Sequence, residues 1–222
     1  MAQTAIIYLT DNSLDESLAA VVRKRLLESA DDTPIVSVSQ RPVDLGENIC
    51  VGEIGRSWDS LYKQLLVGIT ALDTRFVHIV EHDCLYTPEH FQWEPPEDGI
   101  FYYNANCWLV QWGGNHPELN GMYSYWPRRL AMSQLVCNRE LLRVAIEERM
   151  DLLGEGKSVR KEWLGCGEPG VISERAVMKA AVLAKSGRAV KLDEFLDKYL
   201  RKYTSKAFNN ILPNLDIRHS SN

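Results

Sequence analysis

Three short stretches of this chain consist mainly of β-branched and other apolar residues, and each is short enough to be a buried strand. They run from Ala5 to Thr10, from Ile35 to Ser39 and over the first half of Phe76–Tyr86. Mainly apolar runs of this length are typical of strands covered on both faces of a parallel sheet. Between the first two, apolar residues recur at helical spacing, at Leu18, Val21, Val22 and Leu26. This β–α–β start predicts a parallel sheet with a right-handed crossover.

The rest of the chain continues the alternation of extended and helical patterns. A polar connection from Gln40 leads to Ser57, which is a suitable cap for a helix that ends near Leu72. We expect four more helices, at Pro88–Phe91, from Met132 to about Leu153, from Ser173 to about Ala184 and from Leu192 to about Tyr203. A further strand is expected at Ile100–Tyr103, and the tail up to His219 alternates polar and apolar residues. These elements predict an α/β fold, a Rossmann-type three-layer sandwich with a mostly parallel central sheet.

The third apolar run changes into an acid–His–acid sequence where a buried strand should emerge from the sheet. If this segment stays extended, Glu81 and Asp83 point to one side and His82 to the other. In open α/β sheets, ligands bind outside the carboxyl ends of the strands. Two neighbouring carboxylates there favour a site for a cation or for a ligand rich in hydrogen-bond donors. The alternative is that Asp83 only caps the following turn.

The composition is that of an ordinary globular protein of 222 residues, with 45% hydrophobic and 25% charged residues. Neither a signal peptide nor an apolar run long enough to cross a membrane is present. Five scattered cysteines without a CxxC pair indicate reduced thiols, so we expect a cytoplasmic protein. Neither the GxGxxG fingerprint nor a P-loop occurs.

The net charge of −5 is unevenly distributed along the chain. Residues 1–119 carry a net −11 and residues 120–222 a net +6. Such a split suggests that the two halves face different partners, although solvated helix faces also absorb charge.

Four segments together resemble the GT-A class of nucleotide-sugar glycosyltransferases, and within it the small bacterial and phage enzymes of that fold. They are the acidic segment Glu81–Tyr86, the strand Tyr102–Trp108, the turn Gly167–Gly170 and the closing segment Asn214–His219. Their order along the chain also matches. The resemblance implies a single GT-A-like domain over residues 1–222, with a nucleotide-sugar-binding half at 1–112 and an acceptor half with a closing tail at 113–222.

The resemblance further implies a divalent metal, Mn²⁺ or Mg²⁺, that bridges the diphosphate of a sugar nucleotide. Asp83 would bind this metal and His219 would complete its coordination. Glu81 replaces one acid of the more usual Asp-x-Asp, is one methylene longer, and would lie near the ribose or the metal. Oxygen ligands suit both metals, and one imidazole favours Mn²⁺.

We expect a UDP-linked donor that is contacted by residues at strand ends and at a helix start. Asp11 is placed to accept hydrogen bonds from uracil or ribose, unless it only shapes the turn. The two asparagines at 104 and 106 would place amides in a pocket, unless they only satisfy backbone groups. The expected donor contacts are Thr10, Asp11, Ser57, Glu81 and Asn106.

Transfer to a hydroxyl group also needs a general base from the second half of the chain. Glu168, framed by glycine and proline, is our first choice. Asp216 and Glu140 are the alternatives.

Two other functions compete with glycosyl transfer. A nucleotidyltransferase on a related scaffold is disfavoured because Thr10–Asp15 contains no basic residue. A non-catalytic module that binds nucleotide sugars stays open. The basic second half, including Arg128 and Arg129, would suit an anionic acceptor such as a hydroxymethylated base in DNA, with a glycan as the alternative. The oligomeric state stays open as well.

Overall fold

The computed structural model describes residues 3–112, 118, 121–125, 130–155, 168–169, 204–208 and 214–219. In this part of the chain a seven-stranded sheet forms the centre, in the order β10-β6-β9-β4-β1-β2-β3. All neighbouring pairs are parallel except those made by β9, which is antiparallel to both β4 and β6. The strands are β1 (Thr4–Thr10), β2 (Ile35–Ser39), β3 (Glu47–Cys50), β4 (Phe76–Glu81), β6 (Ile100–Asn104), β9 (Leu135–Asn138) and β10 (Thr204–Phe208).

A smaller sheet stands beside the end of β4, in the order β5-β11-β7-β8 among the described residues. Its strands are β5 (Cys84–Leu85), β7 (Cys107–Trp112), β8 (Tyr123–Tyr125) and β11 (Asn214–His219). The tail is therefore an internal strand, antiparallel to β5 and parallel to β7.

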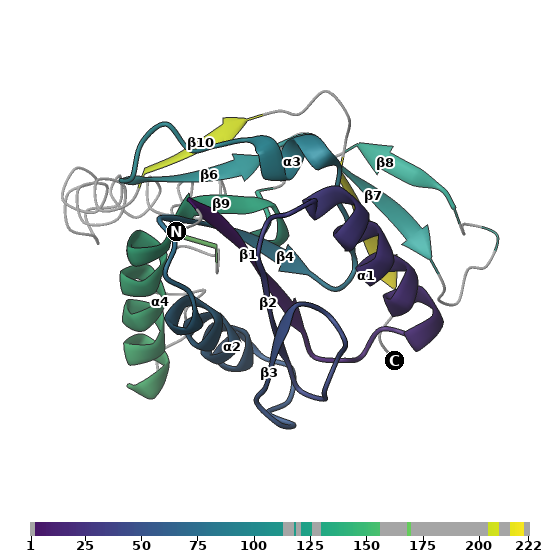
Figure 1. Cartoon of the computed structure of the whole chain (residues 1–222). Helices are drawn as coiled ribbons and strands as arrows, with labels where there is room; N and C mark the ends of the chain where they lie inside the picture. The colour runs from purple at the N-terminus through teal and green to yellow at the C-terminus, as the bar shows by residue number, and fades with distance from the viewer. Residues whose placement is uncertain are drawn as a thin grey trace, which may run out of the picture.

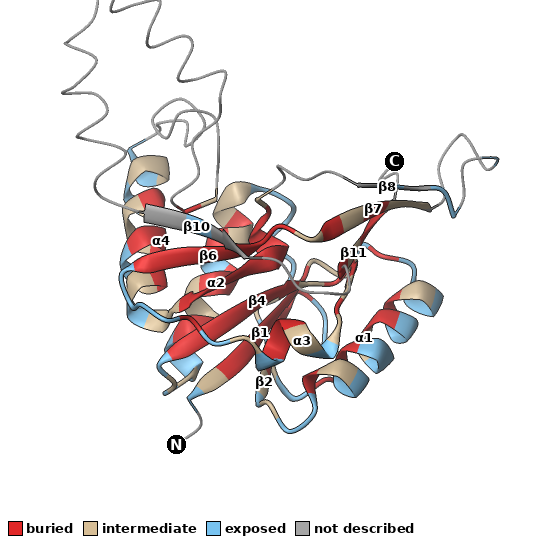
Figure 2. Cartoon of the chain, turned by 90° about the horizontal axis from the view of Figure 1, so that it is seen from above, coloured by how far each residue is buried: buried red, intermediate tan, exposed pale blue. Residues whose placement is uncertain are grey.

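Helices cover both faces of the central sheet (Figure 1). α2 (Trp58–Ala71) and α4 (Arg139–Gly154) pack together on one face, and α1 (Glu16–Ala30) and the short α3 (Pro88–Gln92) lie on the other. Two apolar clusters fill the spaces between the layers, and Figure 2 shows the buried strands running between the helices. The predicted fold class, a three-layer α/β sandwich with a mostly parallel central sheet, is confirmed.

Local sequence explains where the main helices begin. The Asp15 side chain accepts from the Ser17 amide at the start of α1, and the predicted cap Ser57 accepts from the Ser60 amide at the start of α2. Asn138 caps α4 in the same way, through the amides of residues 140 and 141. Each such cap satisfies backbone N–H groups that have no partner inside the helix.

Three expectations about secondary structure were wrong. The polar connection after Gln40 contains strand β3, which pairs with β2. The helix expected from Met132 begins only at Arg139, because Leu135–Asn138 forms strand β9 between β4 and β6. The run from Phe76 to Tyr86 is not one strand, since the chain turns at residues 82–83 between β4 and β5.

The helices expected at 173–184 and 192–203 lie outside the described residues, as do Arg128 and Arg129. Within the described part of the chain, no helix combines the length and apolarity needed to cross a membrane.

A glycine in α2 permits close contact between this helix and the central sheet. A Cβ atom on Gly68 would lie 2.6 Å from Cγ2 of Ile7 and 3.3 Å from Cγ2 of Val38. We predict that Gly68→Ala lowers the free energy of unfolding by about 1–3 kcal/mol, because overpacking outweighs the better helix propensity of alanine. Urea denaturation measures this change. Gly154→Ala at the end of α4, where a Cβ meets nothing within 4 Å, is the control and should be neutral or stabilising.

His78, in the middle of β4, is fully buried beside the rings of His90 and Phe91. Burial lowers its pKa from 6.5 to about 3. Between these values the unfolded chain binds a proton that the native protein excludes, so acid destabilises the native state as the pH falls below 6.5. Between pH 6.5 and pH 4.5 this single group lowers the free energy of unfolding by about 2.5 kcal/mol. We predict that the His78→Met protein lacks this part of the acid-dependent loss. Urea titrations at both pH values test this, and equal losses in the two proteins would contradict it.

Candidate functional site

The candidate site lies where the chain changes direction within the central sheet. From β1 the chain first adds β2 and β3 on one side, and α2 then returns it to β4 on the other side of β1. β1 and β4 are parallel neighbours in register from Thr4–Phe76 to Leu9–Glu81, so their carboxyl ends meet at one edge. In open α/β sheets such a switch point is the usual place for a ligand.

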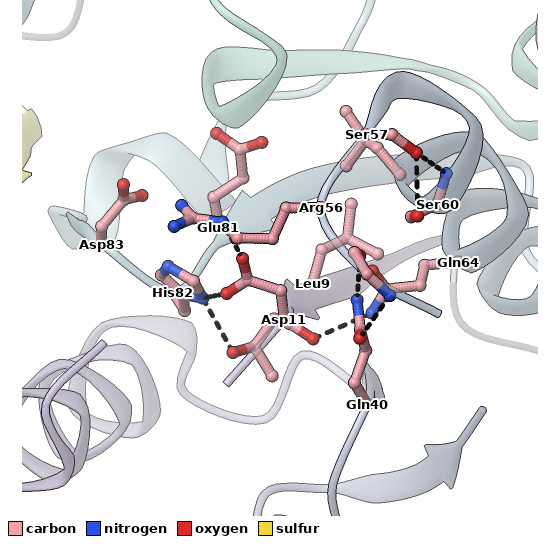
Figure 3. Close-up of a pocket in the computed structure, with 13 residues that line it drawn as sticks. Leu9, Asp11, Gln40, Arg56, Ser57, Ser60, Gln64, Glu81, His82 and Asp83 are labelled. Atoms are coloured by element: carbon pink, nitrogen blue, oxygen red, sulfur yellow. Dashed lines mark hydrogen bonds and ion pairs between the residues drawn. The ribbon is translucent and has the colours of Figure 1, made fainter. Parts of the chain in front are cut away.

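A cavity of about 220 Å³ opens at this switch point (Figure 3). It is lined by the ends of β1, β2 and β4, by the segment before α2 and by the first turns of α2. The lining residues are Leu9, Thr10, Asp11, Gln40, Gly55, Arg56, Ser57, Ser60, Leu61, Gln64, Glu81, His82 and Asp83.

Asp11 is the charged group at the centre of this cavity. Its Oδ2 atom forms an ion pair with Nε of Arg56 at 2.5 Å, and its Oδ1 atom lies 3.5 Å from Nδ1 of His82. Burial raises the pKa of Asp11, but hydrogen bonds from Ser13 and the charges of His82 and Arg56 outweigh that effect and lower it overall. Asp11 is therefore a carboxylate at neutral pH and can accept hydrogen bonds from a ligand.

The acidic turn after β4 places its three side chains in two directions. Figure 3 shows the carboxylates of Glu81 and Asp83 pointing the same way, with His82 turned toward Asp11. The hydrogen bond between Nδ1 of His82 and Oγ1 of Thr10, 2.8 Å long, joins the ends of β4 and β1. The predicted arrangement of the two acids thus arises at a turn rather than along an extended strand.

Arg56 was not anticipated from the sequence, and its position depends on a buried glutamine. Oε1 of Gln40 accepts from the amides of Ile54 and Gly55, at 3.0 and 3.1 Å, and its Nε2 donates to the Gly55 carbonyl at 2.6 Å. Ser60 also donates to the Ile54 carbonyl. These bonds fix the backbone just before Arg56, whose side chain remains half exposed. The sequence carries no motif at these positions; the burial of Gln40 directly after β2 is visible only in the structure.

Gln64 was likewise missed, and it fastens β1 to β2 beside the cavity. Its Nε2 atom donates to the carbonyls of Thr10 and Val38, both at 2.9 Å. The amides of Gln40 and Gln64 are thus used to build the cavity, whereas its charged residues face a prospective ligand.

The structure brings together five of the residues proposed from the sequence and separates the others. Thr10, Asp11, Ser57, Glu81 and Asp83 line one cavity. The others are found elsewhere: Asn106 follows β6, Asp216 is buried in β11 opposite Cys84, and Glu168 stands before Pro169, whose carbonyl accepts from the Tyr103 hydroxyl.

His219 is the last residue of β11, and its side chain lies outside the described residues. The backbone of its strand does reach the acidic turn, because the Ile217 amide donates to the Asp83 carbonyl at 2.6 Å. Among the described residues, no group of three or more His, Cys, Asp or Glu side chains is gathered as a metal site. Glu81 and Asp83 both line the cavity, and their carboxylates, which are potential metal ligands, point the same way.

Sequence comparisons give no relative for this chain: no family profile matches it, and no curated protein does. Solved structures that resemble it at low sequence identity include a glycosyltransferase. A glycosyltransferase involved in the glycosylation of the major capsid of PBCV-1 is 8% identical, with a TM-score of 0.49, 99% of this chain covered and 95% of the other.

The second similar protein is TarS residues 1–349 from S. aureus, 10% identical in two structures. In its complex with UDP-GlcNAc the TM-score is 0.44, with 100% of this chain and 60% of TarS covered. In a second structure of the same TarS fragment the TM-score is 0.43, with 97% of this chain and 60% of TarS covered. This chain therefore spans less than two thirds of that TarS fragment, and likenesses at this level assign neither a donor nor a reaction to it.

The role of Gln40 as an anchor can be tested by stability. We predict that Gln40→Ala lowers the free energy of unfolding by about 1–3 kcal/mol, because three partly buried hydrogen bonds to the backbone of Ile54 and Gly55 are lost together. Thermal or urea unfolding measures this loss. Gln92→Ala, at the exposed end of α3, is the control and should change stability by less than about 0.5 kcal/mol. Equal effects of the two substitutions would show that Gln40 is not an anchor.

Proposed function

We propose that this chain is a metal-dependent glycosyltransferase of the GT-A type, which transfers a sugar from a nucleotide-sugar donor, UDP-linked in our proposal, to a hydroxyl group. The observation that carries the proposal is the cavity at the switch point between β1 and β4 and the charges that line it. The four sequence segments that resemble such enzymes support it independently of the cavity.

The charges of the cavity explain why a metal is part of the proposal. Three carboxylates line it, from Asp11, Glu81 and Asp83, against one guanidinium, from Arg56. A diphosphate entering alone would meet net repulsion. A divalent cation between the acidic turn and the phosphates removes this repulsion, and one or two carboxylates with phosphate oxygens and water are a normal ligand set for Mg²⁺. The residues therefore fit Mn²⁺ or Mg²⁺ without a preformed three-residue site.

Six of the lining residues receive a role toward the ligand in this proposal. Asp83 and Glu81 would hold the metal, with His219 as a further ligand from the tail. Asp11 would accept from the base or ribose, and Arg56, once released from Asp11, would pair with a phosphate. Thr10 and Ser57 would shape the nucleoside end of the cavity. When bound, the metal supplies Lewis-acid stabilisation of the departing nucleoside diphosphate.

Glu168 is our proposed general base for the acceptor hydroxyl. Its neighbour Pro169 is fixed by Tyr103, whose hydroxyl donates to the Pro169 carbonyl at 2.6 Å. Asp216 is less suitable because it is buried inside the second sheet. Glu140 lies at the opposite edge of the sheet from the cavity, because it comes just after Asn138, which pairs with Phe76 at the start of β4. Its carboxylate also accepts from Arg143.

In this proposal the class of acceptor is inferred only from the distribution of charge along the chain. The basic second half of the chain favours an anionic acceptor, for which DNA bearing a hydroxymethylated base is one choice and a glycan another. A nucleotidyltransferase would release pyrophosphate from a nucleoside triphosphate, and a non-catalytic module would bind the donor without turnover. Release of nucleoside diphosphate from a nucleotide sugar separates glycosyl transfer from both.

The direct test is a thermal-shift panel of UDP-, GDP-, dTDP- and CMP-sugars, each with and without Mn²⁺. A true donor present at about 100 times its Kd should stabilise the native state by about 2.7 kcal/mol, or roughly 5–10 °C. We predict that Asp83→Asn keeps the fold and the melting temperature without ligand, but loses the Mn²⁺-dependent part of the shift and of nucleoside diphosphate release.

Asp59→Asn is the matched control, since Asp59 forms an exposed pair with Lys63 on α2. It should behave as the wild type. Wild-type Mn²⁺ dependence in the Asp83→Asn protein would exclude Asp83 as a metal ligand, and the absence of any shift across the panel would exclude a nucleotide-sugar donor from the panel.

A further inference from the structure

The largest fully buried side chain in the described part of the protein is a charged one, Arg149 in α4. Arginine is almost never fully buried without a compensating partner, because removing its charge from water is costly. Its Nη1 atom donates to the Ala145 carbonyl one turn earlier, at 2.7 Å. A carbonyl alone does not neutralise a guanidinium, so the location of its counter-charge is informative.

Arg149 shares its surroundings with Tyr62 of α2, which is also fully buried. Burial raises the pKa of Tyr62, the guanidinium of Arg149 lowers it, and the carboxylate of Glu168 raises it. The Tyr62 phenol therefore experiences both charges, one from α4 and one from the turn at residues 168–169.

The turn that carries Glu168 is held in this place by the core. The Tyr103 hydroxyl donates to the Pro169 carbonyl, and Pro169 itself is buried. Tyr103, Tyr62 and Ala145 belong to one apolar cluster, so the turn packs on the same core as the part of α4 that carries Arg149.

This cluster lies next to the cavity at the switch point. Tyr62 directly follows Leu61, which lines that cavity in the first turns of α2. α4 starts at Asn138, beside the beginning of β4, and by Arg149 it has risen about 16 Å toward the edge where β4 ends. Figure 1 shows α4 and α2 side by side along this course.

We propose that Glu168 is the counter-charge of the buried Arg149, and that this pair, with Tyr62 between α2 and α4, fixes the Glu168 carboxylate beside the cavity. Arg149 is then a positioning residue that acts through Glu168. Its effect on turnover rests on the role of Glu168 in the proposed function, but the pairing does not.

A double-mutant cycle in thermal stability tests the pairing without any substrate. Glu168→Gln leaves the buried guanidinium uncompensated and should lower the melting temperature by about 5–10 °C. Adding Arg149→Met to that variant should raise the melting temperature again, whereas the same substitution in the wild type should not. Additive effects of the two substitutions would overturn the proposal.

Arg149→Lys keeps the positive charge and should retain most of the stability. This variant separates the effect of the charge from the effect of lost packing. Arg143→Met is the control within the same helix, because Arg143 is partly exposed and pairs with Glu140 and Glu147. It should neither shift the melting temperature by more than about 2 °C nor couple to Glu168→Gln.

Turnover separates this inference from the proposed function. With the nucleotide sugar that gives the largest shift in the panel, Arg149→Met should lower kcat at least tenfold at unchanged donor KM, with partial rescue in Arg149→Lys. Non-additive melting temperatures in the double-mutant cycle, together with normal turnover in Glu168→Gln, would support the pairing and overturn Glu168 as the base. An unchanged kcat in Arg149→Met, when Glu168→Gln is inactive, would overturn the positioning role.

Discussion

The hydrogen bond between Thr10 and His82 holds the candidate site together. It joins the ends of two strands that are neighbours in the sheet but 72 residues apart in the sequence. Because β1 and β4 are parallel and in register, their ends can meet only at this edge. His82 uses its ring to reach Thr10 and Asp11, which leaves the carboxylates of Glu81 and Asp83 directed the other way. The Thr10–His82 hydrogen bond therefore both joins the ends of β1 and β4 and leaves the Glu81 and Asp83 carboxylates on the opposite side of the turn.

The second sheet contributes to the same turn through the backbone of the tail. The Ile217 amide binds the Asp83 carbonyl, and the Asn214 side chain accepts from the Thr87 amide and donates to Gln134. Gln134 in turn donates to the thiol of Cys84, beside Asp83. These are bonds between buried polar groups, which are costly to leave unmade. The position of Asp83 consequently depends on the correct assembly of strands from both ends of the chain.

The parts of the fold that could be predicted from the sequence are those decided by local pattern. Local sequence alone indicates the apolar strands β1, β2 and β4 and the helix cap at Ser57. Strand β3 could not be found this way, because the four residues Glu47–Cys50 are too short and too mixed to show a strand pattern, and they become a strand by pairing with β2. Strand β9 was missed because its apolar residues continue a helical pattern, and pairing with β4 and β6 decides otherwise.

The same division applies to the candidate site. Acids at a strand end are visible in a sequence because topology places strand ends at the ligand edge. Gln40, Arg56 and Gln64 follow no motif. The two glutamines matter because they bind backbone groups distant in the sequence, and Arg56 matters because it pairs with Asp11. The turn at Asp83 also takes its geometry from β11, whose Ile217 amide binds the Asp83 carbonyl from more than a hundred residues further along the chain. No local pattern around Glu81–Asp83 can reveal a contact at that separation, so the direction of the two acids had to come from the structure.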